Sequence, residues 1–319
     1  MPVAYIVAVA CLHVAAGVLL VVAMGHWPML VGFAGLAYAL GMRHGFDADH
    51  IVAIDGTTRS LLAQRQRAQG VGFFFSLGHS TVVLLLALWI AHATEAAGRF
   101  LPTLRAIGGD VGLAASSAFM LLTAVLNLMI FRDTLHAADD PSASNESPRG
   151  GVMARLLGRV IRLVRRAPQM YFVGFAFGLG FDTASEVALL AIAATVGAHA
   201  LPMLAVLVLP ISFAAGMALV DTAEGMFMVR AYSWAQDEPA RRARYNLVVT
   251  GFTAVAAVMV GAMEIANLSW LGGNVGSTVL GAAIAATFPM LWMIAALNAH
   301  VRRKSSVLQQ AGSPPRRSN

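Results

Sequence analysis

Long apolar stretches alternate with short polar ones along nearly the whole chain. A helix that spans a membrane needs about 20 mostly apolar residues, and eight stretches reach that length. The pattern predicts an all-α polytopic membrane protein with a single transmembrane domain over residues 1–302. The expected helices cover residues 3–24, 28–54, 71–92, 111–131, 169–196, 201–229, 246–267 and 276–300.

The remaining segments are polar. The first apolar stretch lacks a preceding basic region and is long for a signal peptide, so we expect a retained helix. Residues 132–168 form a predicted cytoplasmic loop, and the basic amphipathic run at 155–166 suits the surface of an anionic lipid membrane. Residues 303–319 are expected to form a disordered cytoplasmic tail.

Composition and charge fit a membrane protein. The chain is 58% hydrophobic and 12% charged, whereas soluble domains are about one quarter charged. Nineteen of the 22 basic residues, Arg59 among them, fall on one side of the eight-helix arrangement, and only Arg99 and Arg105 fall on the other. Because positive charge stays cytoplasmic, both termini are predicted to be cytoplasmic, in the inner membrane. Topology therefore explains the net charge of +6 without a nucleic-acid partner, and the expected partners are lipid and a metal ion.

Cysteine and lysine are nearly absent. Cys11 is the one cysteine, so an internal disulfide and a thiolate metal cluster are excluded. Lys304 is the one lysine, so no GxxxxGK[ST] loop exists, and we expect no obligatory ATPase. Transport by this chain would be secondary or would use a separate motor protein.

Residues 44–50 read His-Gly-Phe-Asp-Ala-Asp-His inside the second apolar stretch. A charged side chain near the bilayer centre costs at least about 2.5 kcal/mol, so such residues are functional candidates. On an ideal helix, one arc of about 120° holds Arg43, His44, Asp47 and His50, and Asp49 points the other way. Direct ligation by Asp49 would require a distorted helix, which Gly45 favours.

Other intramembrane polar residues complete the candidate site. The predicted metal ligands are His44, Asp47, Asp49, His50 and His79. Residues predicted to line the transport path or to support the ligands are Arg43, Ser80, Asp182, Glu186 and Asp221. His13 beside Cys11 is a candidate accessory ligand. Mixed imidazole and carboxylate ligands favour Ni²⁺, Co²⁺, Zn²⁺ or Mn²⁺ over Cu(I), Mg²⁺ or Ca²⁺, and ligand chemistry alone leaves the choice within that group open.

An internal repeat relates two of the expected helices. Residues 45–53 align without gaps to residues 180–188, with five identities that include Gly-Phe-Asp in both copies. An offset of three helices reverses the direction of crossing, so the repeat would have inverted topology, helices 2–4 against helices 5–7. Secondary transporters often place their site at such an interface.

With these residues in view, the chain resembles the nickel/cobalt transporter family of eight-helix secondary permeases. His44, Asp49 and His50 match the family signature H-x4-D-H, and further family-like blocks occupy residues 75–80, 179–186 and 215–222. The resemblance implies uptake of Ni²⁺ or Co²⁺ as substrate, without a prosthetic group or enzymatic activity, and a requirement for the signature residues. Glu224 departs from the family pattern, where aspartate is expected, and no residue decides between nickel and cobalt.

The expected mechanism begins with an ion from outside. The histidines and aspartates of the second helix, with His79, would strip its water and pass it to Asp182 and Glu186. Two alternatives remain at this stage. A metal sensor or accessory protein would bind without transport, and an intramembrane acyltransferase would use His44 and Asp49 as its His-x4-Asp pair.

Overall fold

The computed structural model describes residues 2–92, 107, 110–125, 127–129, 131–132, 164–180, 184–198, 202–236, 239–267 and six positions between 283 and 293. Within these ranges every regular element is a helix. Five helices are long and apolar enough to cross a membrane: Val3–Met24, Val71–Ile90, Asp110–Met129, Ala205–Trp234 and Val248–Ala266. The described part of the chain therefore has the all-helical, multi-pass architecture that its hydrophobic pattern predicts.

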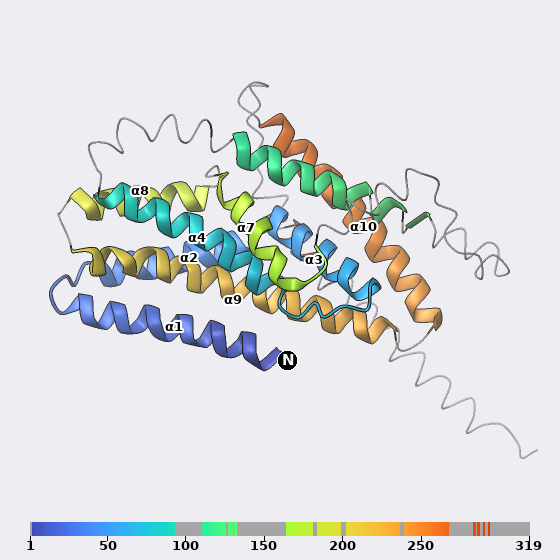
Figure 1. Cartoon of the computed structure of the whole chain (residues 1–319), viewed down its shortest axis with the longest axis horizontal. Helices are drawn as coiled ribbons and strands as arrows, with labels where there is room; N and C mark the ends of the chain where they lie inside the picture. The colour runs from blue at the N-terminus through green and yellow to red at the C-terminus, as the bar shows by residue number, and fades with distance from the viewer. Residues whose placement is uncertain are drawn as a thin grey trace, which may run out of the picture.

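Eight helices carry labels in Figure 1. They are α1 (Pro2–Met24), α2 (Leu30–Gly45), α3 (Ala48–Ala63), α4 (Val71–His92), α7 (Met170–Gly178), α8 (Ala184–Ala198), α9 (Met203–Gln236) and α10 (Pro239–Ala266). A 3₁₀ turn at Ala167–Gln169 leads into α7. Most of the predicted span 276–300, nearly all of loop 132–168 and the tail 303–319 lie outside the described residues.

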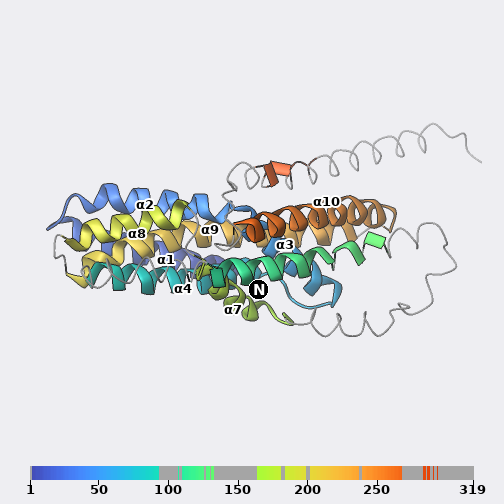
Figure 2. The same ribbon diagram turned by 90° about the horizontal axis from the view of Figure 1, so that it is seen from above.

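The helix α9 is the long axis of the bundle. It has 34 residues and contacts α1, α2, α3, α4, α8 and α10. Figures 1 and 2 show α2, α4 and α8 along its first half and α3 and α10 along its second half. The buried apolar side chains form two clusters. Phe213 of one cluster lies against His44 and Phe75 of the other lies against His50, so the histidines sit where the two clusters meet.

Two predicted helices are divided, and both divisions fall at a Gly-Phe-Asp copy. The span expected at 28–54 consists of α2 and α3, which are separated by Phe46 and Asp47. In the span expected at 169–196, α7 ends at Gly178 and α8 begins at Ala184; Leu179 and Gly180 are not helical, and residues 181–183 lie outside the described residues. Hydropathy does not reveal these interruptions, because the residues on both sides of each break are apolar enough to continue a helix.

Helix ends also differ from the prediction where the helices extend past the apolar stretch. The ends of α1 and α4 agree closely with 3–24 and 71–92, but α9 continues to Gln236 and α10 begins at Pro239. Proline is favoured in the first turn of a helix, which explains the early start of α10. Because α3 continues to Ala63, Arg59 lies within a helix and is 8% exposed. Our assignment of Arg59 to a cytoplasmic loop is therefore corrected.

Glycines allow the helix backbones to approach one another closely. A Cβ atom on Gly174 of α7 would lie 1.9 Å from the Phe75 carbonyl oxygen of α4, and one on Gly41 of α2 would lie 2.0 Å from the Phe213 oxygen of α9. Lipid tails are as apolar as leucine, so helix association in membranes depends on such tight packing. On the outer surface, α1 exposes Val3, Val14 and Val21 by 64% each, which suits contact with lipid.

Replacement of Gly174 by alanine is expected to destabilise the fold by about 1–3 kcal/mol, because the added methyl group overlaps the α4 backbone. Gly35→Ala is the matched control, since a Cβ atom on Gly35 meets no atom within 4 Å. Melting temperatures of the purified variants in one detergent measure the difference. Equal melting temperatures for the two variants would contradict the close approach of α4 and α7.

Candidate metal site

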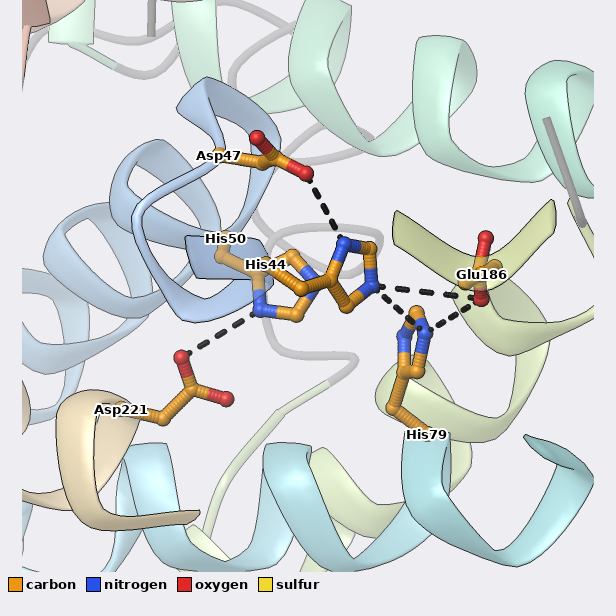
Figure 3. Close-up of polar contacts among 6 residues, drawn as sticks. All are labelled: His44, Asp47, His50, His79, Glu186 and Asp221. Carbon is orange, nitrogen blue, oxygen red and sulfur yellow. Dashed lines mark hydrogen bonds and ion pairs between the residues drawn. The ribbon is translucent and has the colours of Figure 1, made fainter. Parts of the chain in front are cut away.

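Three histidines from three helices meet in the interior. His44 lies in the last turn of α2, His50 in the first turn of α3 and His79 within α4. Their ring centroids are 4.5, 4.8 and 5.0 Å apart. The rings are buried, with residue exposures of 0%, 0% and 2%. One ring nitrogen from each histidine lies within 4.8 Å of the other two, so the three side chains form a group that could hold a metal ion (Figure 3).

Two carboxylates orient two of these rings from behind. Asp47 Oδ2 accepts a hydrogen bond from His44 Nδ1 at 2.8 Å, and Asp221 Oδ1 of α9 accepts one from His50 Nδ1 at 3.3 Å. This leaves each Nε2 turned toward the other histidines (Figure 3). Among the described residues, His50 Nε2 has no hydrogen-bond partner. Metal-binding histidines characteristically donate their second nitrogen to a carboxylate, which fixes the tautomer and the ring direction.

Glu186 of α8 approaches the inner nitrogens. Its Oε1 lies 2.9 Å from His79 Nε2 and 3.9 Å from His44 Nε2. The two Nε2 atoms are themselves 3.0 Å apart. A carboxylate oxygen and two ring nitrogens therefore converge on one small volume, and a hydrogen bond between them requires at least one shared proton.

The break between α2 and α3 produces this convergence. On one continuous helix, His44 and His50 would be separated by a rise of about 9 Å. Instead, the amide of Asp47 bonds to the His44 carbonyl at 2.9 Å, and Asp47 adopts an extended conformation with ψ of 147° before α3 begins. A Cβ atom on Gly45 would lie 2.8 Å from Val220 of α9, so glycine allows the turn to pack there.

A cavity of about 50 Å³ adjoins the cluster. Asp47 lines it and connects it to His44, and Asp49 reaches it from the first turn of α3. Glu264 of the facing helix α10 and Asn267, directly after the end of α10, also line it. Asp49 is thus a wall residue of the cavity, and direct ligation by Asp49 stays a prediction.

The other predicted residues occupy different surroundings. Arg43 is half-buried in the last turn of α2, and Ser80 is buried next to His79. Asp182 lies outside the described residues. His13 of α1 contacts the Val9 carbonyl at 2.8 Å and the Tyr38 hydroxyl at 3.2 Å, at a distance from the histidine cluster. Cys11 is exposed on α1.

Sequence reasoning missed a second buried polar group. Asp55 and Arg59 of α3 join Tyr232 of α9 and Thr253 of α10 in one hydrogen-bonded network. The spacing of Asp55 and Arg59, four residues apart, was the available signal, because oppositely charged residues at that spacing share one helix face. Our placement of the helix end at residue 54 concealed it.

Fold and site together define a multi-pass membrane protein with a buried three-histidine cluster supported by carboxylates. The model of the NicO family, described as high-affinity nickel-transport protein, matches residues 30–298. The chain belongs to this family, which confirms the resemblance carried by the four sequence blocks.

Curated relatives extend over most of the chain. The nickel transporter NixA of Staphylococcus aureus is 38% identical over 92% of this chain and 92% of its own length. The nickel transporter NicT of Mycobacterium tuberculosis is 41% identical over 86% and 80%, and the cobalt transport protein NhlF of Rhodococcus rhodochrous is 42% identical over 86% and 84%. These relatives are transporters, which confirms that the chain is not an enzyme and excludes the acyltransferase alternative. No solved structure shows significant similarity.

Asp221→Asn is expected to weaken divalent metal binding by about 10- to 100-fold, because His50 loses the carboxylate that orients its ring. Asparagine keeps the size of the side chain, so the fold should be retained. Equilibrium binding of ⁶³Ni²⁺ to purified protein measures the change, with His13→Gln as a histidine variant outside the cluster. An affinity equal to that of the unmodified protein would show that Asp221 does not support a ligand.

Proposed function

We propose that this chain is a secondary transporter that takes up Ni²⁺, Co²⁺ or both across the cytoplasmic membrane. The observation that carries the proposal is the buried convergence of His44, His50 and His79 with carboxylates on the outer ring nitrogens. The relatives named as a nickel transporter and a cobalt transport protein support the same cargo. A purely structural polar cluster would not require three imidazole nitrogens to face one another.

In this proposal the transported ion binds directly to His44, His50, His79 and Glu186. Two ligands held about 2.1 Å from one ion at a right angle lie about 3.0 Å apart, which matches the separation of the His44 and His79 Nε2 atoms. Glu186 Oε1 lies 2.9 Å from one of these nitrogens and 3.9 Å from the other, both within the roughly 4.2 Å that two such ligands of one ion can span. Asp47 and Asp221 act as orienting groups, so Asp47 has a different role from the direct ligation predicted from the sequence.

The cavity supplies a route to the cluster. Asp49 and Glu264 would attract a hydrated cation, and Asp47 lies between them and His44. With cytoplasmic termini, α10 runs outward and carries Glu264 near its outer end, so the cavity would receive ions from outside. Ligation requires deprotonated nitrogens, so binding displaces the proton shared near His79 and Glu186.

Movement of the ion would follow from the two divided helices. We propose that the second to fourth and the fifth to seventh of the spans expected from the sequence form the inverted repeat. Rocking of one repeat against the other would expose the site alternately to each side. The breaks at Gly45–Asp47 and after Leu179 would then be equivalent hinges. An inside-negative potential is sufficient to drive uptake, since two charges crossing 100 mV gain about 4.6 kcal/mol.

Cells that express the chain are expected to accumulate ⁶³Ni²⁺ in a saturable manner, and His50→Ala is expected to abolish accumulation because a convergent nitrogen is lost. His13→Ala is the control. Excess unlabelled Co²⁺ measures the preference between the two metals, and collapse of the membrane potential should reduce uptake. Tight ⁶³Ni²⁺ binding without accumulation would instead identify a metal sensor.

Glu264→Gln is expected to raise the KM for uptake about 10-fold with little change in maximal rate, because a charge that concentrates cations in the cavity is removed. The effect should change little with ionic strength, since Glu264 is 6% exposed and salt screens buried charges much less than exposed ones. Ser117→Ala, a substitution in the helix that contains Leu113 and Ser116 of the cavity wall, serves as the control. An unchanged KM at low ionic strength would remove the cavity from the entry route.

A further inference from the structure

A second buried polar cluster lies beyond the histidines along α3. At its centre is the guanidinium group of Arg59, an 8% exposed residue paired with the fully buried Asp55. The two Nη atoms donate to oxygens from four separate helices. These contacts are Asp55 Oδ2 at 2.5 Å, Thr253 Oγ1 at 2.6 Å, Tyr232 Oη at 3.0 Å and Asn127 Oδ1 at 3.0 Å.

Two of these oxygens also contact Asp55 directly. Thr253 Oγ1 lies 3.0 Å from Asp55 Oδ2, to which it is placed to donate, and the Tyr232 hydroxyl donates to Asp55 Oδ1. Asp55 is thus the hub of a cage contributed by α3, α9, α10 and the helix containing Asn127. A carboxylate, an amide oxygen and two hydroxyl oxygens form a ligand set that suits hard divalent cations.

The cage fits a guanidinium incompletely. Among the described residues, Arg59 Nε and Asn127 Nδ2 are buried and lack a hydrogen-bond partner. A partly satisfied buried network is costly, and an ion pair in a dry interior is often no more stable than apolar packing. Stability alone is therefore a weak reason for this network.

Carboxylates connect the cage to the histidine site. Asp221 contacts His50 through Oδ1, and its buried Oδ2 lacks a hydrogen-bond partner in the described part of the chain. One turn further along α9, Glu224 has a buried Oε2 that also lacks one. Glu224 lies within electrostatic range of both Asp221 and Asp55. A series of carboxyl groups thus leads from the histidines to Asp55.

We propose that the oxygen cage at Asp55 is a second cation site, that Arg59 occupies it as a tethered cation in this conformation, and that the transported divalent ion replaces the guanidinium on its way out. This inference rests on the proposed function. While Arg59 fills the cage, the route from the histidines toward the end of α3 is closed. Arrival of the ion releases the arginine, and departure of the ion allows it to return.

The test is the number of ⁶³Ni²⁺ ions bound per chain by the full-length protein in lipid nanodiscs. The unmodified protein should bind one ion, which His44→Ala removes. Arg59→Gln should bind a second, weaker ion, because Asp55 then lacks a cation. The double variant Arg59→Gln/Asp55→Asn should bind one ion again, and Arg59→Lys, which keeps the positive charge, should also bind one.

The outcomes separate the two proposals. Absence of any binding by the unmodified protein would overturn the proposed function. One ion in both the unmodified protein and folded Arg59→Gln would leave the histidine site intact and overturn the second site. Should Arg59→Gln fail to fold, modification of Arg59 by phenylglyoxal in the unmodified protein decides the question. Excess Ni²⁺ should accelerate that modification, and an unchanged rate would overturn the displacement of Arg59.

Discussion

The arrangement of the molecule depends on keeping three imidazole rings hydrogen-bonded in an interior that excludes water. A buried polar group without a partner costs several kcal/mol in such surroundings. Asp47, Glu186 and Asp221 provide the partners, and they belong to the start of α3, to α8 and to α9. These hydrogen bonds satisfy the buried rings and also link five helices. His44 and His79 belong to α2 and α4, which join α3, α8 and α9. Hydrogen bonds thus determine how the helices are placed at the centre of the bundle, and apolar side chains pack around them.

Close backbone contact maintains that register. A Cβ atom on Gly72 of α4 would lie 1.8 Å from the carbonyl oxygen of Asp221, and one on Gly78 would lie 1.9 Å from that of Tyr171 on α7. The height of Asp221 relative to His79 is thus set by direct contact between α4 and α9. Small residues serve this purpose in membranes because association there cannot draw on the hydrophobic effect.

Apolar length was enough to predict the helical class and the spans at 3–24 and 71–92, because each is one uninterrupted run. It could not locate the break at Asp47, which depends on a contact between Gly45 and α9 rather than on any local signal.

The residue types of the cluster indicated a metal site, and the structure brings His44, His50 and His79 together. The roles of Asp47 and Asp221 depend on which ring nitrogen each one faces, and the Arg59 network depends on contacts across four helices. Neither is encoded in spacing along one helix.

The two-residue interruption after Gly45 changes what a metal site can do. Ligands on a single rigid helix keep one spacing, so their affinity for an ion is nearly constant. His44 and His50 instead belong to separate helices joined by Phe46 and Asp47. A small rotation of α3 against α2 would alter the distance between their ring nitrogens, and with it the chelate that holds the ion in the proposed function. A transporter of the proposed kind must bind its ion tightly from a dilute medium and then release it rapidly, and ligands on two joined helices would allow both with one set of side chains.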